Sequence, residues 1–211
     1  FGNLSDSQGG AIYGTASSLI AIRNSTFSAN IAGSTGDILY LGGTAQASIG
    51  NTILDGSTTP HPNCAGNAVA SLGHNIDTGS TCAANLGLGD MPLTNPLLGA
   101  LNFNGGSLPV LTTQMPSYAS PAIDHGDPAI CAHPSVDNED ETGAKRPKNG
   151  SGSGAAACDV GAVEVPERKP AYDAEPMPPG PINFGSVQVN TTITTSINVH
   201  NAGNYTLTLS N

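Results

Sequence analysis

Four cysteines are the residues with the most definite chemistry in this chain, and they fall into two local pairs. Cys64 and Cys82 enclose a loop rich in Gly, Asn and Ser, whereas Cys131 and Cys158 enclose an acidic, then basic, then Gly-rich loop. Neither pair has Cys-x-x-Cys spacing, and no His stands at a zinc-ligand interval from them, which argues against a metal site. The even number and local pairing predict the disulfides 64–82 and 131–158. Such disulfides would contribute roughly 3 to 4 kcal/mol each and indicate an oxidising compartment.

Residues 137–141 form the densest group of oxygen ligands in the sequence, with Asp137, Glu139, Asp140 and Glu141. Carboxylates at this density are typical of calcium loops, but the spacing lacks the Gly and the terminal Glu of an EF-hand. We therefore expect no cofactor, with calcium bound at these four residues as the alternative.

A third set of ionisable residues combines Asp124, Asp127 and Asp159 with the bases Lys145 and Arg146. Asp side chains commonly cap turns, and we expect these three to do so and to pair with the two bases. The five His residues are dispersed, and no Ser/His/Asp or Cys/His arrangement is recognisable. The sequence therefore predicts no catalytic residues and a protein that is not an enzyme.

The elements that must position these residues include a repeated unit between Gly9 and Gly56. Ile12 corresponds to Ile38, 26 residues later, and Asn24 corresponds to Asn51, 27 residues later. Each copy alternates apolar with small polar residues and then turns at Asn. A unit of this kind cannot bury its own apolar face but can stack on a copy of itself. Short alternating strands with this period predict an all-β fold, the coils of a right-handed parallel β-helix.

The coil pattern predicts which side chains enter the interior. We expect the apolar positions to line one continuous core and the Asn residues to form a ladder of stacked amides at one corner. These positions are Ile20, Ile22, Asn24 and Phe27 in the first coil, Ile49, Asn51 and Leu54 in the second, and Leu72, Asn75 and Ile76 in a degenerate third coil.

Polysaccharide lyases also use β-helices, with carboxylates that hold calcium and an Arg or Lys base on the outer face of the coils. In this chain the coils carry one basic residue, Arg23, and the acids Asp37, Asp55 and Asp77. These acids do not recur at one coil position. We therefore expect them to solvate the surface rather than to form a stacked acidic site.

Several motifs downstream of the repeat occur in a characteristic order. They are Asn-Pro-Leu-Leu-Gly-Ala-Leu at 95–101, Asn-Gly-Gly at 104–106, Ser-Pro-Ala-Ile-Asp-His-Gly-Asp at 120–127, Lys-Arg-Pro at 145–147 and Cys-Asp-Val-Gly-Ala-Val-Glu at 158–164. This set resembles the C-terminal region of bacterial right-handed parallel β-helix surface proteins, the choice-of-anchor type Q group. The stretches 24–30 and 71–75 resemble the coil motif and the last coil of that group. The resemblance covers about residues 9–165 and implies a cap on the helix, cell-surface anchoring and no catalytic residues.

Residues 166–181 are rich in Pro, which predicts an extended linker. Residues 182–211 then resemble the opening strands of an ASH-type immunoglobulin-like module, although about 30 residues give only two or three of the roughly seven strands of a sandwich. We expect this partial β tail either to join another copy of the chain, by strand addition that builds a filament, or to be completed by the rest of a longer polypeptide. Its apolar positions are Phe184, Val187, Val189, Ile193, Ile197, Val199, Tyr205, Leu207 and Leu209.

The composition limits the partners. The net charge of −10, with only six Lys and Arg in 211 residues, makes nucleic acid and anionic membranes poor partners. No apolar run is long enough for a membrane span. We therefore expect domains at 1–165 and 182–211 in a non-enzymatic extracellular or cell-surface protein that adheres or assembles. The alternative is a carbohydrate-binding or polysaccharide-cleaving β-helix whose active coils lie upstream, and surface carbohydrate is the other partner we expect.

Overall fold

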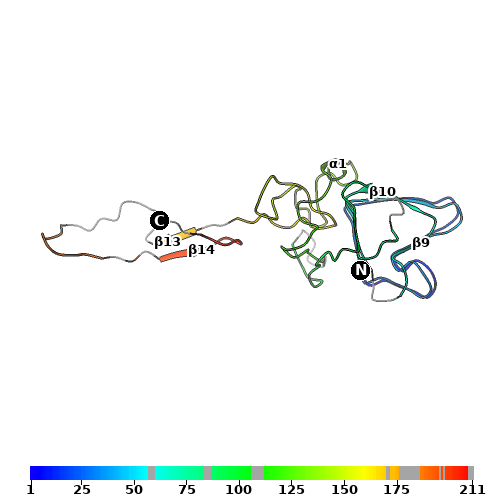
Figure 1. The fold of residues 1–211 in the computed structure, drawn as a ribbon, viewed down its shortest axis with the longest axis horizontal. Coiled ribbons are helices and arrows are strands. Elements are labelled where there is room, and N and C mark those ends of the chain that lie inside the picture. The colour runs from blue at the N-terminus through cyan, green and yellow to red at the C-terminus, as the bar shows by residue number, and fades with distance from the viewer. Residues whose placement is uncertain are drawn as a thin grey trace. The chain divides into compact units, whose positions relative to one another are not determined.

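The structure is a computed structural model that describes residues 1–56, 60–82, 87–105, 112–169, 172–175, 186–194, 196 and 198–208. The chain divides into two compact units, Phe1–Glu167 and Arg168–Asn211. Within the described residues the fold is all-β, with short strands and one helix, α1 (Pro128–Cys131) (Figure 1).

The first unit contains three sheets of parallel strands, which the chain visits in the same order on each pass. The sheets are β2 (Ile12–Gly14), β6 (Leu39–Leu41) and β9 (Cys64–Gly66); β3 (Leu19–Arg23), β7 (Gln46–Gly50) and β10 (Val69–Gly73); and β4 (Thr26–Ser28), β8 (Ile53–Asp55), β11 (Ile76–Asp77) and β12 (Met91–Pro92). A short parallel pair, β1 (Leu4–Ser5) with β5 (Ile31–Ala32), completes this arrangement. We call each pass through the sheets a coil.

Each coil lies directly on the next, as the overlaid passes in Figure 1 show. Ile22 pairs with Ile49 and Phe27 pairs with Leu54, both 27 residues apart, so the predicted repeat is present in the structure. At the first strand the register differs from the prediction, because Ile12 pairs with Leu39 rather than with Ile38.

The coil interior is aliphatic, as the pattern predicted. Ile22, Ile49 and Leu54 are buried in one cluster, and Ile20 and Phe27 are half-buried against it. Residues that the prediction did not name, among them Ile38, Leu39, Leu41 and Val69, complete the cluster.

Two of the predicted core positions are wrong. Leu72 is 44% exposed, because the pairing of β10 with β7 shifts by one residue between Ser71 and Gly73 and leaves Leu72 as the extra residue. Ile76 is buried, but it lies in a second cluster with Ile53, Ala122 and Val160. Both faces of this sheet are therefore covered, one by the coil interior and the other by the chain that follows the coils.

That following chain, residues 120–165, is here called the cap. Among its described residues it has only α1 and isolated bridges as regular structure. The cap touches the coils closely at Gly161, whose N–H donates to Asn51 O at 2.8 Å. Gly161 has a φ of +99°, and a Cβ at this position would lie 2.7 Å from Ile53 Cδ1 and 2.8 Å from Thr26 Oγ1. A side chain would therefore separate the cap from the sheet.

In the second unit, β13 (Tyr172–Glu175) pairs antiparallel with β14 (Asn198–Asn201). A strand therefore lies inside the range 166–181 that we expected to be linker. The Arg168 guanidinium lies over the Tyr205 ring, 5.0 Å from its centre. Val187, Val189, Ile193, Val199 and Tyr205 are exposed and Leu207 is half-buried, whereas Phe184, Ile197 and Leu209 lie outside the described residues.

Candidate functional site

Both predicted disulfides are present. Cys64 in β9 is bonded to Cys82, and Cys131 at the end of α1 is bonded to Cys158, with Cα–Cα distances of 4.8 and 6.8 Å. All four cysteines are buried. The first disulfide closes the last coil, and the second closes the cap.

The corner between the second and third sheets carries the residues that attach the cap. Asn24 and Asn51 occupy it with φ values of 42° and 49°, in the left-handed region that Asn tolerates better than most residues. Asn51 Nδ2 donates to Asn24 Oδ1 at 3.5 Å, so these two amides stack as predicted. The third member is His74, with φ 56°, and not Asn75. Asn75 lies one residue further along, where its Oδ1 accepts from Thr52 N.

These corner side chains bind the cap directly. Asn51 makes a pair of bonds with Asp127, donating from Nδ2 to the carbonyl oxygen at 3.0 Å and accepting from the N–H at 2.8 Å. Asn24 Nδ2 donates to Cys131 Sγ at 3.2 Å. His74 Nδ1 lies 2.6 Å from His125 O. The corner column therefore joins the coils to one segment of the cap, residues 125–131.

The predicted Asp residues do cap turns in the cap. Asp127 accepts from Ala129 N at the start of α1, and Asp124 accepts from Gly150 N and Ser151 N. Asp159 accepts from Asp124 N at 2.7 Å and from Val165 N at 2.6 Å, which links two loops.

The predicted pairing of these Asp residues with Lys145 and Arg146 is wrong. Lys145 pairs at the surface with Glu139, and this bond raises the pKa of Lys145. Arg146 is buried and pairs with Glu164, with 2.9 Å between Nη1 and Oε2. The same guanidinium donates to Asp159 O at 2.9 Å and to Gly161 O at 2.8 Å.

Glu164 is the central residue that sequence reasoning missed, although it ends the Cys-Asp-Val-Gly-Ala-Val-Glu motif. It is 2% exposed and accepts from Asp159 N and Lys148 N as well as from Arg146. Burial raises the pKa of Glu164 and lowers that of Arg146. Burial, together with the Glu164 charge, raises the pKa of Asp159 to about 7.

Two carboxylates of the acidic stretch 137–141 are engaged within the chain itself. Asp140 accepts from Thr142 N, Ala144 N and Glu164 N, each at 2.8 Å, so its oxygens hold the backbone. Glu139 is paired with Lys145. Among the described residues, no group of three or more His, Cys, Asp or Glu is arranged to hold a metal ion.

The acids of the coils are also structural rather than solvating, which corrects the prediction. Asp37 is buried and accepts from Ala32 N, and Asp55 is half-buried, so that its pKa is raised by burial although Ser28 donates to it. Asp77 is buried and accepts from Asn63 Nδ2 at 2.6 Å and Gly79 N at 2.8 Å. Arg23, like Asp55, is half-buried and keeps some surface contact.

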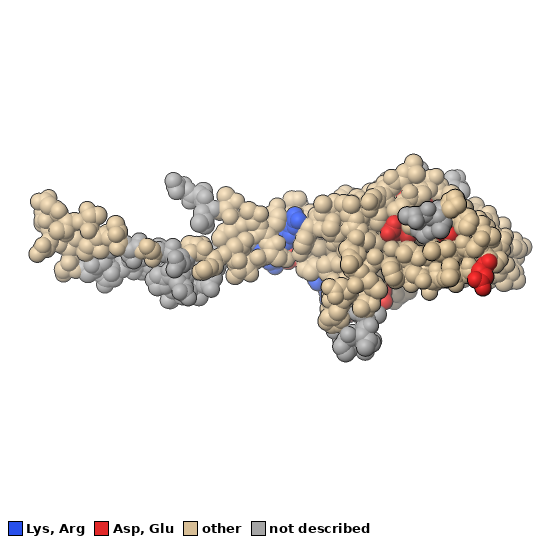
Figure 2. Space-filling view, turned by 90° about the horizontal axis from the view of Figure 1, so that it is seen from below, with Lys and Arg blue, Asp and Glu red and all other residues tan. Residues whose placement is uncertain are grey.

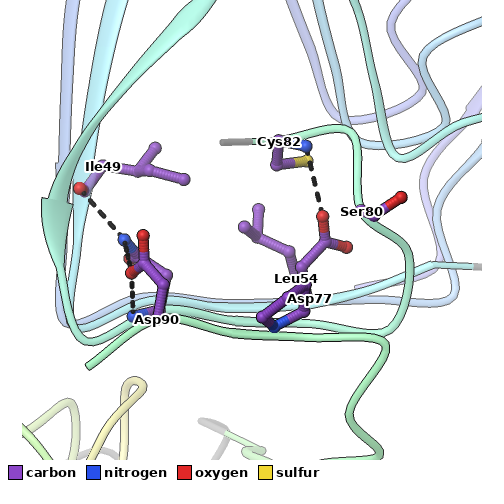
Figure 3. A pocket seen from close by; sticks show the side chains of 8 residues that line it. Ile49, Leu54, Asp77, Ser80, Cys82 and Asp90 are labelled. Carbon is purple, nitrogen blue, oxygen red and sulfur yellow. Dashed lines mark hydrogen bonds between the residues drawn. The ribbon is translucent and has the colours of Figure 1, made fainter. Parts of the chain in front are cut away.

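Asp77 and Asp90 line a pocket in the last coil (Figure 3). They line a cavity of about 10 Å³ with Ile49, Leu54 and Cys82, a space that a single water molecule would fill. Asp77 also accepts from Cys82 N, and Asp90 accepts from Asn75 N and Ser71 Oγ. The oxygens of both carboxylates are therefore engaged in hydrogen bonds with the chain itself.

Neither a protein-family model, nor a curated protein, nor a solved structure matches this chain. In the part of the chain that the structure describes, no helix is both long and apolar enough to cross a membrane. Lys, Arg, Asp and Glu occupy little of the face seen in Figure 2, in agreement with the 10% of charged residues in the sequence.

Proposed function

We propose that this chain is a non-enzymatic structural or adhesive protein of the cell surface or extracellular space, built on a right-handed parallel β-helix with a cap. The observation that carries the proposal is how the carboxylates of the interior are bonded. Asp77, Asp140, Asp159 and Glu164 are buried and Asp90 is half-buried, and each of the five accepts several hydrogen bonds from the chain itself. Groups so engaged hold loops in place and are poor general acids or bases for a bound substrate.

The parallel stacking supports the β-helix. Strands of three sheets recur after 27 residues in the second coil and after 22 to 25 residues in the third, and the aliphatic interior continues from one coil to the next. Each coil buries its apolar face only against its neighbours, which is the property of a stacked repeat protein. Two disulfides support an oxidising, and therefore extracellular, location.

The second unit supports assembly with another copy. Val189 is 88% exposed, in a turn where Thr191 N–H donates to Gln188 O, and Ile193, after this turn, is 47% exposed. Among the described residues the β13–β14 sheet has only two strands, so each has an open edge onto which another strand can add. A head-to-tail contact of this kind would build a filament.

The experiment compares the full chain with the double variant Val189→Asp, Ile193→Asp and with the control Thr192→Asp, by light scattering coupled to size-exclusion chromatography. We expect concentration-dependent oligomers for the wild type and the control, and monomers for the double variant. Monomers for all three proteins would refute assembly through the tail. Release of reducing ends from a panel of polysaccharides would refute the non-enzymatic assignment.

Two features of the coil surface favour the alternative function, carbohydrate binding. The outer face of β3 and β7 borders an open hollow of about 470 Å³, lined by Leu19, Ala21, Gln46 and Ser48 among others. On the first sheet the rings of Tyr13 and Tyr40 stack at 5.4 Å, and Tyr13 is 54% exposed. If these coils bind glycans, Tyr13→Ala should abolish retention on a glycan array, whereas Leu93→Ala should not.

A further inference from the structure

Two histidines far apart in the sequence line one hollow at the junction of the last coil and the cap. His74 belongs to the coil corner and His125 belongs to the cap. The hollow has a volume of about 360 Å³, and its other lining residues are Gly89, Asp90, Met91, Asp124 and Gly126. Neither His takes part in the function proposed above.

The hydrogen bonds of the two rings determine which nitrogen atoms carry protons. His74 Nδ1 lies 2.6 Å from His125 O, and His125 Nδ1 lies 2.5 Å from Ile123 O. A carbonyl oxygen can only accept, so Nδ1 must be the donor in both rings. In the neutral imidazoles the Nε2 atoms therefore hold free lone pairs. This is the arrangement by which proteins orient histidines that bind metals, with the second nitrogen donating to a carbonyl.

His74 is also fixed in place more firmly than a surface histidine. Its φ of 56° sets it in the corner column after Asn24 and Asn51. Gly89, at φ +74°, lies against the ring, and a Cβ there would come within 2.7 Å of Nδ1. An Asn at position 74 would meet the need for a left-handed corner and a donor to the cap. Only His adds a second nitrogen with a lone pair.

The carboxylates in the hollow complete the local environment. Asp90 is already engaged by Asn75 N, Ser71 Oγ and Gly87 N, so it contributes negative charge rather than a free ligand. Asp124 accepts two backbone N–H bonds and is half-buried. Negative charge beside two imidazole lone pairs favours a cation at this position.

We propose that His74 and His125 bind a divalent transition-metal ion through their Nε2 atoms, with water in the remaining positions. Imidazole ligands suit Zn²⁺, Cu²⁺ and Ni²⁺, whereas Ca²⁺ and Mg²⁺ prefer oxygen. The ion would bridge the last coil to the cap between residues 51 positions apart in the chain. It would bind the folded protein and not the unfolded chain, and would therefore raise the unfolding temperature.

The test uses the full, tag-free chain with Cu²⁺ or Zn²⁺ alone. We expect one Cu²⁺ per chain, with nitrogen hyperfine structure from imidazole in its electron paramagnetic resonance spectrum, and a Zn²⁺-dependent rise in unfolding temperature. His74→Asn preserves the corner and its donor but removes Nε2, and should weaken Cu²⁺ binding at least tenfold. His125→Asn should do the same and should also remove the rise in temperature.

The control is His133→Asn. The Nδ1 of His133 lies 2.9 Å from Ser135 Oγ, away from the hollow, and this variant should bind both ions as the wild type does. The proposal is overturned if the wild type shows no imidazole-coordinated Cu²⁺, if His74→Asn binds as tightly as the wild type, or if His133→Asn weakens binding equally.

Discussion

The coils and the cap form one compact unit but are stabilised in different ways. The first two coils repeat after 27 residues and the third after 22 to 25, and their strands pair in parallel over an aliphatic interior. The cap has no repeat and little regular structure among its described residues, and its backbone N–H groups are bound by Asp124, Asp140, Asp159 and Glu164. The coils therefore rely on buried apolar area, whereas the cap relies on buried charge.

This difference explains why the two regions should respond differently to substitution. Apolar burial is tolerant of small changes in shape and is distributed over many side chains. A buried ionic network depends on each partner, because removal of one leaves the others buried and uncompensated. In the cap, three buried carboxylates, those of Asp140, Asp159 and Glu164, surround the single buried cation Arg146.

The largest expected effect comes from placing charge in the coils. Ile22→Asp puts an unpaired carboxylate in the aliphatic interior, which should cost several kcal/mol (about 4 or more) and prevent folding. Leu72→Asp changes an exposed position of the same region and should alter the free energy of unfolding by about 0.5 kcal/mol or less. Circular dichroism and limited proteolysis distinguish the two. A folded Ile22→Asp protein would contradict the assigned interior.

The next largest effect is expected from a substitution that removes the buried cation of the cap. Arg146→Met leaves Glu164 buried without its partner and should lower the free energy of unfolding by about 3 to 5 kcal/mol. Lys145→Met breaks a solvent-exposed pair with Glu139 and should leave the free energy of unfolding nearly unchanged. Urea denaturation measures both. Equal losses for the two variants would mean that the cap does not depend on buried charge.

The cap should also make stability depend on pH. The pKa of Asp159 is raised from 3.8 to about 7, so between these values the folded protein binds more protons than the unfolded chain. Its contribution is therefore greatest below about pH 4 and is lost as the pH rises through about 7. Relative to Asp159→Asn, the wild type should lose up to about 4 kcal/mol over this range.

The matched control for this pH dependence is Asp137→Asn, which removes an exposed carboxylate of the cap. Its free energy of unfolding should follow the wild-type pH profile. If the profile of Asp159→Asn were parallel to that of the wild type, Asp159 would not be the titrating group.

The smallest effect is expected from a substitution at the boundary between the coils and the cap. Asn51→Gly keeps the left-handed backbone but removes two bonds to Asp127, and should cost about 1 to 2 kcal/mol. Asn138→Gly replaces another left-handed Asn, with φ 50°, whose peptide groups bond to Cys131 and Arg146. This second variant should be close to neutral in thermal unfolding, and a larger loss than for Asn51→Gly would contradict the role of the corner.

The contrast also explains which features could be predicted from sequence. The spacing of Ile22 and Asn24 from Ile49 and Asn51 is a local pattern, and the structure reproduces it. The prediction that Asn75 occupies the corner was wrong. The corner requires a residue in the left-handed conformation, and His74 meets this requirement instead. The prediction that Ile76 lies in the coil interior was wrong. The alternation of apolar and polar residues along a strand cannot reveal that the cap covers the second face of this sheet.

The ion pair of the cap was not predictable in the same way. Nothing in the spacing of Arg146 and Glu164 identifies them as partners, since each is positioned by loops without a period. The disulfides were predictable because each closes a short segment, so proximity in sequence implied proximity in space.

The placement of those disulfides has a mechanical consequence. Each closes a loop within one region, with the first pair of cysteines 18 positions apart in the sequence and the second pair 27 positions apart. If the two ends of the chain were pulled apart, the segments inside these loops could not lengthen. The earlier coils have no such restraint, and the first coil, which repeats after 27 residues, would release about 90 Å of chain if it peeled away, at 3.3 to 3.6 Å per residue. Under load the chain would extend in steps while the last coil and the cap remained locked.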